Sequence, residues 1–270
     1  MRVSGTSASI LWRIGRTKRE EIGALRVRQD DFKARIPSMP PALDFQKSLA
    51  DAPGLSVIAE IKQASPSVGI IAKDFNPSLI ARSYREAGAD AVSVLTDVEY
   101  FKGALNFLCE AKHELGSIPV IRKDFILDEV QIYEARAAGA DSFLLIVAML
   151  ESSHLKELLD LGRSLGMEAL VESHDEEDLQ RAIAAGTRIF GFNNRNLNDF
   201  SIDLAVSARL AKMLPPGALA ISESGIKSPE DAKMVFDAGC KGILVGESLM
   251  RDGPFDCRER LSSFKEACQK

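Results

Sequence analysis

A recurring glycine divides most of this chain into units of similar length. Seven glycines each follow a stretch with helical periodicity and precede an apolar run, and they are spaced 20 to 31 residues apart: Gly88, Gly116, Gly139, Gly166, Gly186, Gly217 and Gly239. Glycine suits the end of a helix because it adopts the left-handed conformation without strain. Each interval has room for about one helix, one strand and two loops. The pattern therefore predicts alternating strands and helices.

Eight strands are expected once the apolar run before the first glycine is included. They lie near residues 56–61, 91–95, 118–122, 141–146, 168–172, 188–192, 218–222 and 241–245. Eight parallel units in about 200 residues are typical of a TIM (β/α)8 barrel. A doubly wound sheet normally has a G-x-G-x-x-G turn after its first strand, and none is present. The predicted fold is an α/β barrel.

The first 50 residues stand outside this repeat. Residues 12–33 are charged with apolar residues at helical spacing, and Thr17 and Glu20 resemble the two ends of a capping box. We expect a helix here that covers the barrel, and a short second helix near residues 43–49. The domain assignment is a helical extension over residues 1–50 and a barrel over 51–270, forming a single domain.

Composition restricts the function classes. The net charge of -5 favours neither nucleic acid nor an anionic membrane as a partner. The longest apolar run, residues 143–150, is far shorter than the roughly 20 residues that span a bilayer. Four cysteines without metal-ligand spacing suit a reducing compartment. Residues 1–14 lack the apolar stretch of a secretion signal, so we expect a cytoplasmic protein, with a trimmed organellar leader as the alternative.

Polar residues gather at the predicted carboxyl-terminal ends of the strands, where barrel enzymes hold their chemistry. They are Glu60, Lys62, Thr96, Lys123, Glu172, Asn193, Arg195, Glu223, Ser224, Gly246 and Glu247. The opposite ends, at Ser56, Ile118, Ser142 and Ala218, carry neutral residues. This asymmetry indicates an enzyme, although a structural barrel can also have one polar mouth.

Two of these residues are candidates for acid–base catalysis. Lys123 is expected to point to the same side as Ile121, opposite Arg122, with a pKa lowered by burial or by a neighbouring cation such as Lys62, so that it acts as a general acid. Its alternative role is a solvated lysine at a strand end. Glu172 is either a general base or an ion-pair partner of Lys62 or Lys123.

Two loops have the composition of a phosphate site. Residues 222–229 and 244–248 follow the seventh and eighth strands, where many barrels bind phosphate through backbone N–H groups. Gly225 and Gly246 permit close approach, and ordinary tight turns are the alternative. Ser228 is expected to cap a helix. The three histidines, His113, His154 and His174, show no partnered spacing, so solvent-facing or capping roles are expected for them.

Seven ordered motifs resemble the indole-3-glycerol-phosphate synthase family. They are residues 58–67, 93–97 with Tyr100 and Phe101, 122–125, 131–135, 193–197, 222–226 and 245–250. The likeness spans nearly the whole chain, including residues 17–21. It implies an enzyme of tryptophan biosynthesis that closes 1-(2-carboxyphenylamino)-1-deoxyribulose 5-phosphate to indole-3-glycerol phosphate, with loss of carbon dioxide and water. It implies no metal or organic cofactor, and it leaves a monomer or weak homodimer as the expected state.

The resemblance also implies roles for individual residues. By motif, Lys123 resembles the general acid, Glu172 the general base, and Lys62 with Glu60 a supporting charge pair. Further substrate contacts would be Ser65, Asn193, Arg195, Glu223 and Ser224, with Phe101, Phe125 and Leu197 lining an aromatic pocket. The phosphate positions would be Lys62, Gly225, Gly246 and Glu247.

The chain departs from the family pattern at a few positions. Val68 replaces a usual basic residue, Ser173 an apolar residue, and Phe192 a valine. No catalytic group is lost, so these changes concern rate and affinity. A sugar-phosphate isomerase barrel would need an Asp or Cys base that the strand ends lack. An inactive docking barrel is disfavoured because Lys123 and Glu172 are both present.

Overall fold

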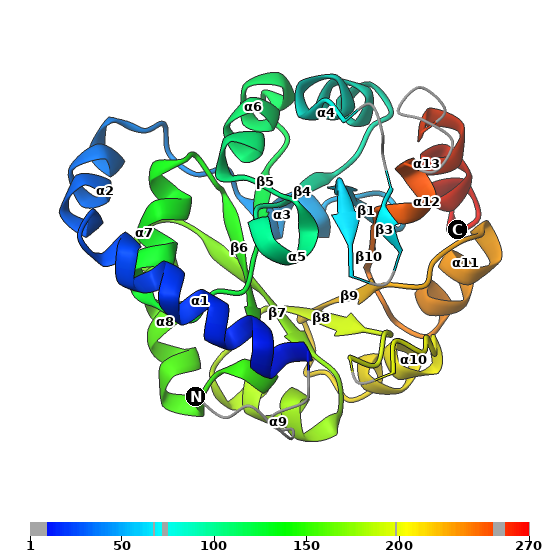
Figure 1. The fold of residues 1–270 in the computed structure, drawn as a ribbon. Helices are drawn as coiled ribbons and strands as arrows, with labels where there is room; N and C mark the ends of the chain where they lie inside the picture. The colour runs from blue at the N-terminus through cyan, green and yellow to red at the C-terminus, as the bar shows by residue number, and fades with distance from the viewer. Residues whose placement is uncertain (1–9, 67, 72–74, 198, 251–256, 270) are drawn as a thin grey trace.

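The computed structural model describes residues 10–66, 68–71, 75–197, 199–250 and 257–269. Its centre is a closed parallel barrel in the order β1-β10-β9-β8-β7-β6-β5-β4 (Figure 1). The strands are β1 (Ser56–Ile61), β4 (Ala91–Leu95), β5 (Val120–Lys123), β6 (Ser142–Ile146), β7 (Glu168–Ser173), β8 (Ile189–Asn193), β9 (Leu219–Glu223) and β10 (Gly242–Val245). The predicted TIM barrel is confirmed, with strand bounds shifted by at most two residues.

Helices surround the barrel on its outside (Figure 1). They are α4 (Pro77–Glu86), α6 (Leu105–Leu115), α7 (Glu129–Ala137), α8 (Ser152–Ser164), α9 (Glu176–Ala184), α10 (Ala205–Ala211), α11 (Pro229–Asp237) and α13 (Cys257–Glu266). All seven glycines of the repeat have positive φ, as their predicted positions after helices require. Ser228 caps α11 in a capping box with Asp231, which confirms its expected structural role.

Shorter elements occupy the loops between these units. They are a two-stranded hairpin, β2 (Ala64–Ser65) with β3 (Gly69–Ile70), the short helices α5 (Val98–Phe101) and α12 (Glu247–Met250), and the 3-10 turn η2 (Val147–Met149). The first two follow the carboxyl-terminal ends of β1 and β4, and α12 follows that of β10. These insertions build the rim of the barrel mouth.

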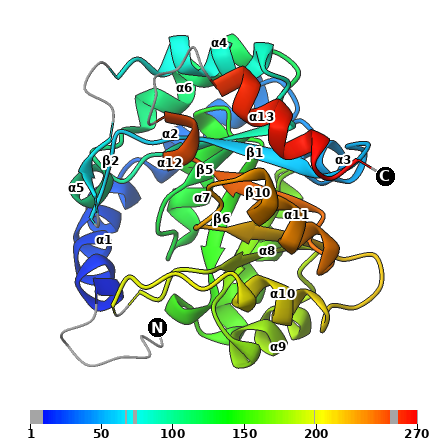
Figure 2. The same ribbon diagram turned by 90° about the vertical axis from the view of Figure 1, so that its right-hand side faces the viewer.

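The segment before β1 covers both ends of the barrel. It contains α1 (Ile10–Arg26), α2 (Gln29–Arg35), η1 (Ile36–Ser38) and α3 (Phe45–Ala50). Leu11 and Ile14 of α1 belong to the same buried cluster as the interior residues of the strands, and so do Phe45 and Leu49 of α3. In Figure 2, α1 lies at one end of the barrel and α3 at the other. The expected covering helix is therefore present.

Three details of the predictions are wrong. The region 12–33 forms two helices, and Thr17 lies inside α1, where its hydroxyl meets the Tyr100 hydroxyl at 3.0 Å, so it is no cap. The amino-terminal strand ends are charged: Asp90, Asp141 and Glu168 lie there in ion pairs with lysine or arginine. These charges bind the barrel to its helices. Residues 1–9, part of the stretch considered as a leader, lie outside the described residues.

Candidate active site

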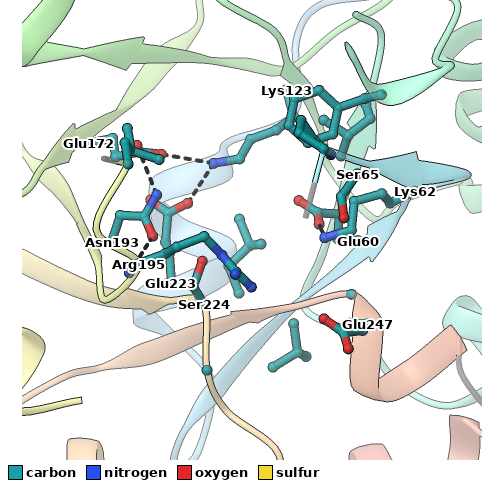
Figure 3. Close-up of a pocket in the computed structure, with 18 of the residues that line it drawn as sticks. Glu60, Lys62, Ser65, Lys123, Glu172, Asn193, Arg195, Glu223, Ser224 and Glu247 are labelled. Atoms are coloured by element: carbon teal, nitrogen blue, oxygen red, sulfur yellow. Dashed lines mark hydrogen bonds and ion pairs between the residues drawn. The ribbon is translucent and has the colours of Figure 1, made fainter. Parts of the chain in front are cut away.

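A pocket opens at the carboxyl-terminal ends of the strands (Figure 3). Thr96 of the predicted polar ring is buried and donates to Asp124 Oδ2 instead of lining the pocket. The other fifteen site residues predicted from the sequence line it: Glu60, Lys62, Ser65, Phe101, Lys123, Phe125, Glu172, Asn193, Arg195, Leu197, Glu223, Ser224, Gly225, Gly246 and Glu247. They come from strands and loops spread over most of the chain. The period-two pattern of the strands and the location of barrel chemistry account for the polar residues at the strand ends, whereas Ser65, Phe125 and Leu197 were implied by the family resemblance.

Lys123 lies at the centre of the polar side chains. It ends β5, and its ammonium Nζ lies 3.1 Å from Glu172 Oε2 and 2.6 Å from Glu223 Oε2 (Figure 3). Its side chain is 12% exposed. Arg122 points the other way, toward Glu134 behind the strand, as the alternation predicts. Lys123 is therefore held in the pocket and is not a solvated lysine at a strand end.

The expected lowering of the Lys123 pKa is wrong. Burial by itself lowers the pKa of the ammonium, but the carboxylates of Glu223, Glu172 and Glu60 more than offset it and raise the pKa above its ordinary value. The positive charge of Lys62 was expected to lower the pKa of Lys123, but this charge is neutralised by an ion pair with Glu60. Lys123 thus enters a reaction at neutral pH as a protonated donor.

Glu172 is buried and has polar partners on both of its oxygens. Lys123 holds Oε2, while Asn193 Nδ2 donates to Oε1 at 3.1 Å and His174 Nε2 lies 3.3 Å from Oε1. Burial alone raises the pKa of Glu172, but Lys123 and His174 bring it below its ordinary value. Glu172 is therefore an ionised carboxylate, and its ion-pair partner is Lys123.

Glu223 has a different electrostatic environment. Burial and the nearby Glu172 carboxylate raise its pKa to about 7, against the opposing effect of Lys123. Its Oε1 is buried without a hydrogen-bond partner among the described residues. Gly191 on β8 makes room for it, since a Cβ there would lie 2.0 Å from this oxygen. The cluster thus contains one ionised carboxylate and one that takes up a proton near neutral pH.

Glu60 and Lys62 form a second charged pair at the end of β1. Lys62 Nζ lies 2.6 Å from Glu60 Oε1, on the opposite side of the pocket from Glu172 (Figure 3). Gly246 packs against this pair, because a Cβ there would lie 2.7 Å from Glu60 Oε1. A side chain at position 246 would therefore clash with Glu60 as well as limit the approach of a ligand.

The loops after β9 and β10 meet beside this pair. Ser224 and Gly225 both have positive φ, at 67° and 88°, so the chain turns sharply at the pocket wall. Two cations that the sequence reasoning missed, Lys227 and Arg260, also line the pocket. Arg260 belongs to α13, far from every motif, and no local pattern distinguished it. These groups give this end of the pocket positive charge and backbone donors.

Aromatic side chains line another part of the pocket. The rings of Phe101 and Phe125 are 6.0 Å apart, and both line the pocket together with Leu197. Helix α1 contributes Ile10, Leu11 and Ile14 to the same pocket, which the sequence reasoning did not anticipate. A helical pattern shows an apolar face but not what that face meets. This apolar region suits a planar ring.

The expectation for His174 is wrong. Its ring lies against Glu172 and faces Asp178 at 3.8 Å, whereas solvent exposure or capping was expected. His113 is exposed, as expected, and His154 on α8 pairs with Glu157. His174 follows β7 directly, and that position at a strand end is the signal that could have indicated it.

A buried lysine connects α1 to the loops that hold the aromatic pair. Lys18 is 1% exposed, and its Nζ lies 2.8 Å from both Asp97 Oδ2 and Asp124 Oδ1. Asp97 Oδ1 accepts from the backbone N–H of Phe101, and Asp124 Oδ1 accepts from that of Phe125. The position of both rings therefore depends on this ion-pair network.

Asp124 provides a pH-dependent test of that network. Burial alone would raise its pKa, but Arg122 and Lys18 lower it from 3.8 to about 2. A carboxyl with a lowered folded-state pKa stabilises the fold above its unfolded pKa, and the contribution is lost as the pH falls through the folded value. The stability difference between wild type and Asp124→Asn should shrink by about 1 kcal/mol between about pH 5 and about pH 3. Urea unfolding followed by circular dichroism measures it, and a constant or growing difference contradicts the assignment.

No helix among the described residues is long and apolar enough to cross a membrane. Within the same ranges, no group of three or more His, Cys, Asp or Glu side chains is placed to hold a metal ion.

The closed barrel and the lysine–carboxylate cluster at its carboxyl-terminal mouth define a (β/α)8-barrel enzyme with acid–base groups. The family model for indole-3-glycerol phosphate synthase matches residues 11–259. The chain belongs to the indole-3-glycerol phosphate synthase family, a family of carboxy-lyases in tryptophan biosynthesis.

Relatives with this name are similar over most of their length. One from Desulfotalea psychrophila is 44% identical over 250 residues, which cover 91% of this chain and 95% of that one. One from Lachnoclostridium phytofermentans is 47% identical over 207 residues, or 77% of this chain and 76% of that one. Among solved structures, thiamine phosphate pyrophosphorylase from Pyrococcus furiosus matches with a TM-score of 0.61 at 13% identity, covering 83% and 97% of the two chains. That likeness shows the fold alone.

Proposed function

We propose that this enzyme closes 1-(2-carboxyphenylamino)-1-deoxyribulose 5-phosphate to indole-3-glycerol phosphate, releasing carbon dioxide and water. The observation that carries the proposal is the contact between a protonated lysine and an ionised glutamate in one pocket, Lys123 and Glu172 at 3.1 Å. Family membership supports the same reaction.

The pocket has separate regions suited to the two ends of this substrate. Positive charge and backbone donors near Gly225, Lys227 and Arg260 suit the phosphate. Phe101 and Phe125 suit the anilino ring. Lys62, Gly246 and Glu247 line the wall beside the phosphate region, and we assign the phosphate to this side of the pocket. Binding at both ends would hold the ketone against the ring carbon, so that binding energy supplies orientation.

Ring closure requires a proton donor at the ketone. The ring carbon that bears the carboxylate attacks the ketone carbon, and Lys123 donates a proton to the oxygen as negative charge develops there. Loss of carbon dioxide leaves its bonding electrons in the ring system and restores aromaticity. The raised pKa of Lys123 keeps this donor protonated at neutral pH.

Dehydration requires an acid and a base together. The hydroxyl formed by ring closure leaves as water after it receives a proton, while a carbon-bound hydrogen is removed as a proton to complete the indole. Glu172 is the proposed base, because it is ionised and lies in the pocket. Lys62 or Lys123 delivers the proton to the hydroxyl, and Ser65, Asn193, Arg195, Glu223 and Ser224 are the proposed further contacts to the substrate.

We assign the enzyme to the cytoplasm, as a monomer or weak homodimer that uses no cofactor. The four free cysteines suit a reducing compartment. Residues 1–50 and 51–270 are proposed to fold as one domain, because Leu11 and Phe45 share a buried cluster with the barrel interior.

A fluorescence assay tests the reaction. The purified protein is expected to convert the substrate into a product with indole fluorescence at the same rate with and without a chelator, because the proposed acid and base are side chains. Mass spectrometry identifies indole-3-glycerol phosphate. An absence of product, or product only after metal is added, contradicts the proposal.

A further inference from the structure

The proposed reaction has a proton balance that the pocket must satisfy. Ring closure consumes one proton at the ketone oxygen and dehydration consumes one at the hydroxyl, while one proton is returned from carbon. The carboxylate leaves as neutral carbon dioxide. Starting from an ionised carboxylate, each turnover therefore takes up one proton from solvent. Lys123 and Glu172 are nearly buried, with side chains 12% and 4% exposed, and bound substrate would cover what remains.

A second cavity adjoins the main pocket. Both are lined by Leu11 of α1 and by Asn193, Arg195 and Leu197 at and after the end of β8. These four residues form the boundary between the two cavities. The second cavity is also lined by His174 and Asp178, and by the exposed residues Asp175, Asn196 and Asp203. It thus extends from the surface to His174, whose ring lies against Glu172 Oε1.

We propose that His174 is a proton relay and positioning residue that passes protons from this second cavity through Glu172 to Lys123, the group that gives up a proton at the ketone. The proposal rests on the proposed function, because the demand for a proton comes from that reaction. His174 Nε2 lies 3.3 Å from Glu172 Oε1, and Nδ1 lies 3.8 Å from Asp178 Oδ2. An imidazole that takes a proton at Nδ1 and releases the other from Nε2 transfers one proton without net change.

Charged groups surround the ring from several elements. They are Glu172 on β7, Asp175 and Asp178 on or beside α9, Glu223 on β9, and Arg195 and Asp203 in the segment after β8. Burial lowers the pKa of His174, but Asp178, Glu172 and Glu223 raise it above the ordinary value. Lys123, on the far side of Glu172, balances part of this negative charge. The raised pKa favours the protonated imidazole, and its Nε2 lies beside Glu172, which contacts Lys123 on its other oxygen.

Removal of the ring tests the relay. His174→Ala is expected to lower kcat at least about tenfold with little change in KM, below the roughly 10²–10⁴-fold effect of a direct acid or base. Added imidazole should restore part of kcat, since the second cavity gives access to the vacated position. His174→Gln should stay slow, because an amide makes hydrogen bonds but does not relay protons. His154→Ala on α8 is the matched control, and its kcat should equal that of wild type with or without imidazole.

A wild-type kcat in His174→Ala, full activity in His174→Gln, or no response to imidazole in folded His174→Ala overturns the relay. Circular dichroism establishes that each variant is folded. Wild-type protein that forms no indole product would overturn the proposed reaction instead.

A titration tests the contact independently of activity. Because the chain has three histidines, His113→Ala with His154→Ala leaves His174 as the only imidazole signal in an NMR titration. Its pKa should lie above that of a free histidine and fall when Glu172→Gln is added. A pKa unaffected by Glu172→Gln contradicts the arrangement.

Discussion

Lys123→Ala is expected to lower kcat by about 10²–10⁴-fold, the loss that follows removal of a general acid. The ketone oxygen would lose the cation that neutralises its developing charge, while phosphate and ring contacts elsewhere in the pocket remain. KM should therefore change much less than kcat. The fluorescence assay, run as a substrate series, measures both constants.

A second lysine supplies the control for stability. Lys112 Nζ pairs with buried Asp141 at 2.5 Å, at the opposite end of the barrel. Lys112→Ala should destabilise the protein through the unpaired carboxylate and leave kcat unchanged. Near-normal turnover in Lys123→Ala, or an equal loss of kcat in Lys112→Ala, removes the acid assignment.

Glu172→Gln should also reduce kcat by about 10²–10⁴-fold, because an amide does not accept the carbon-bound proton. The substitution keeps the shape of the side chain, and its single amide oxygen still accepts from either Asn193 Nδ2 or Lys123 Nζ. The effect on KM is expected to be small. A change confined to KM would reassign Glu172 as a binding residue.

Glu168 on the same strand is the matched control for Glu172. It begins β7, where it pairs with Arg163 and Arg188 outside the pocket. Glu168→Gln should alter stability and leave kcat at the wild-type value. Equal losses in the two variants would indicate a structural effect of disturbing β7.

The glycine repeat was sufficient to predict the barrel because each β/α unit is a local arrangement. Helix ends at residues such as Gly88 and Gly139 depend on backbone conformation within a few positions. The pocket lining followed because the carboxyl ends of parallel strands meet at one mouth. Glu60, Lys123 and Glu172 were placed there by their positions at the predicted strand ends. Their catalytic roles remain predictions.

The features that were missed depend on distances between remote segments. The pKa of Lys123 was expected to be lowered by burial, but Glu60, Glu172 and Glu223 come together only in the folded barrel. Helix α1 lines the pocket because Leu11 and Ile14 pack across the mouth, which an amphipathic pattern does not show. His174 likewise acquires partners from another element, α9.

A crystal structure with indole-3-glycerol phosphate bound is the most direct test of the shared pocket. We expect the indole ring beside Phe101 and Phe125, the phosphate at the loop containing Gly225, and the side chains of Lys123 and Glu172 against the ring between them. Product bound away from Lys123 and Glu172, or with its phosphate at the aromatic end, would contradict the proposed chemistry.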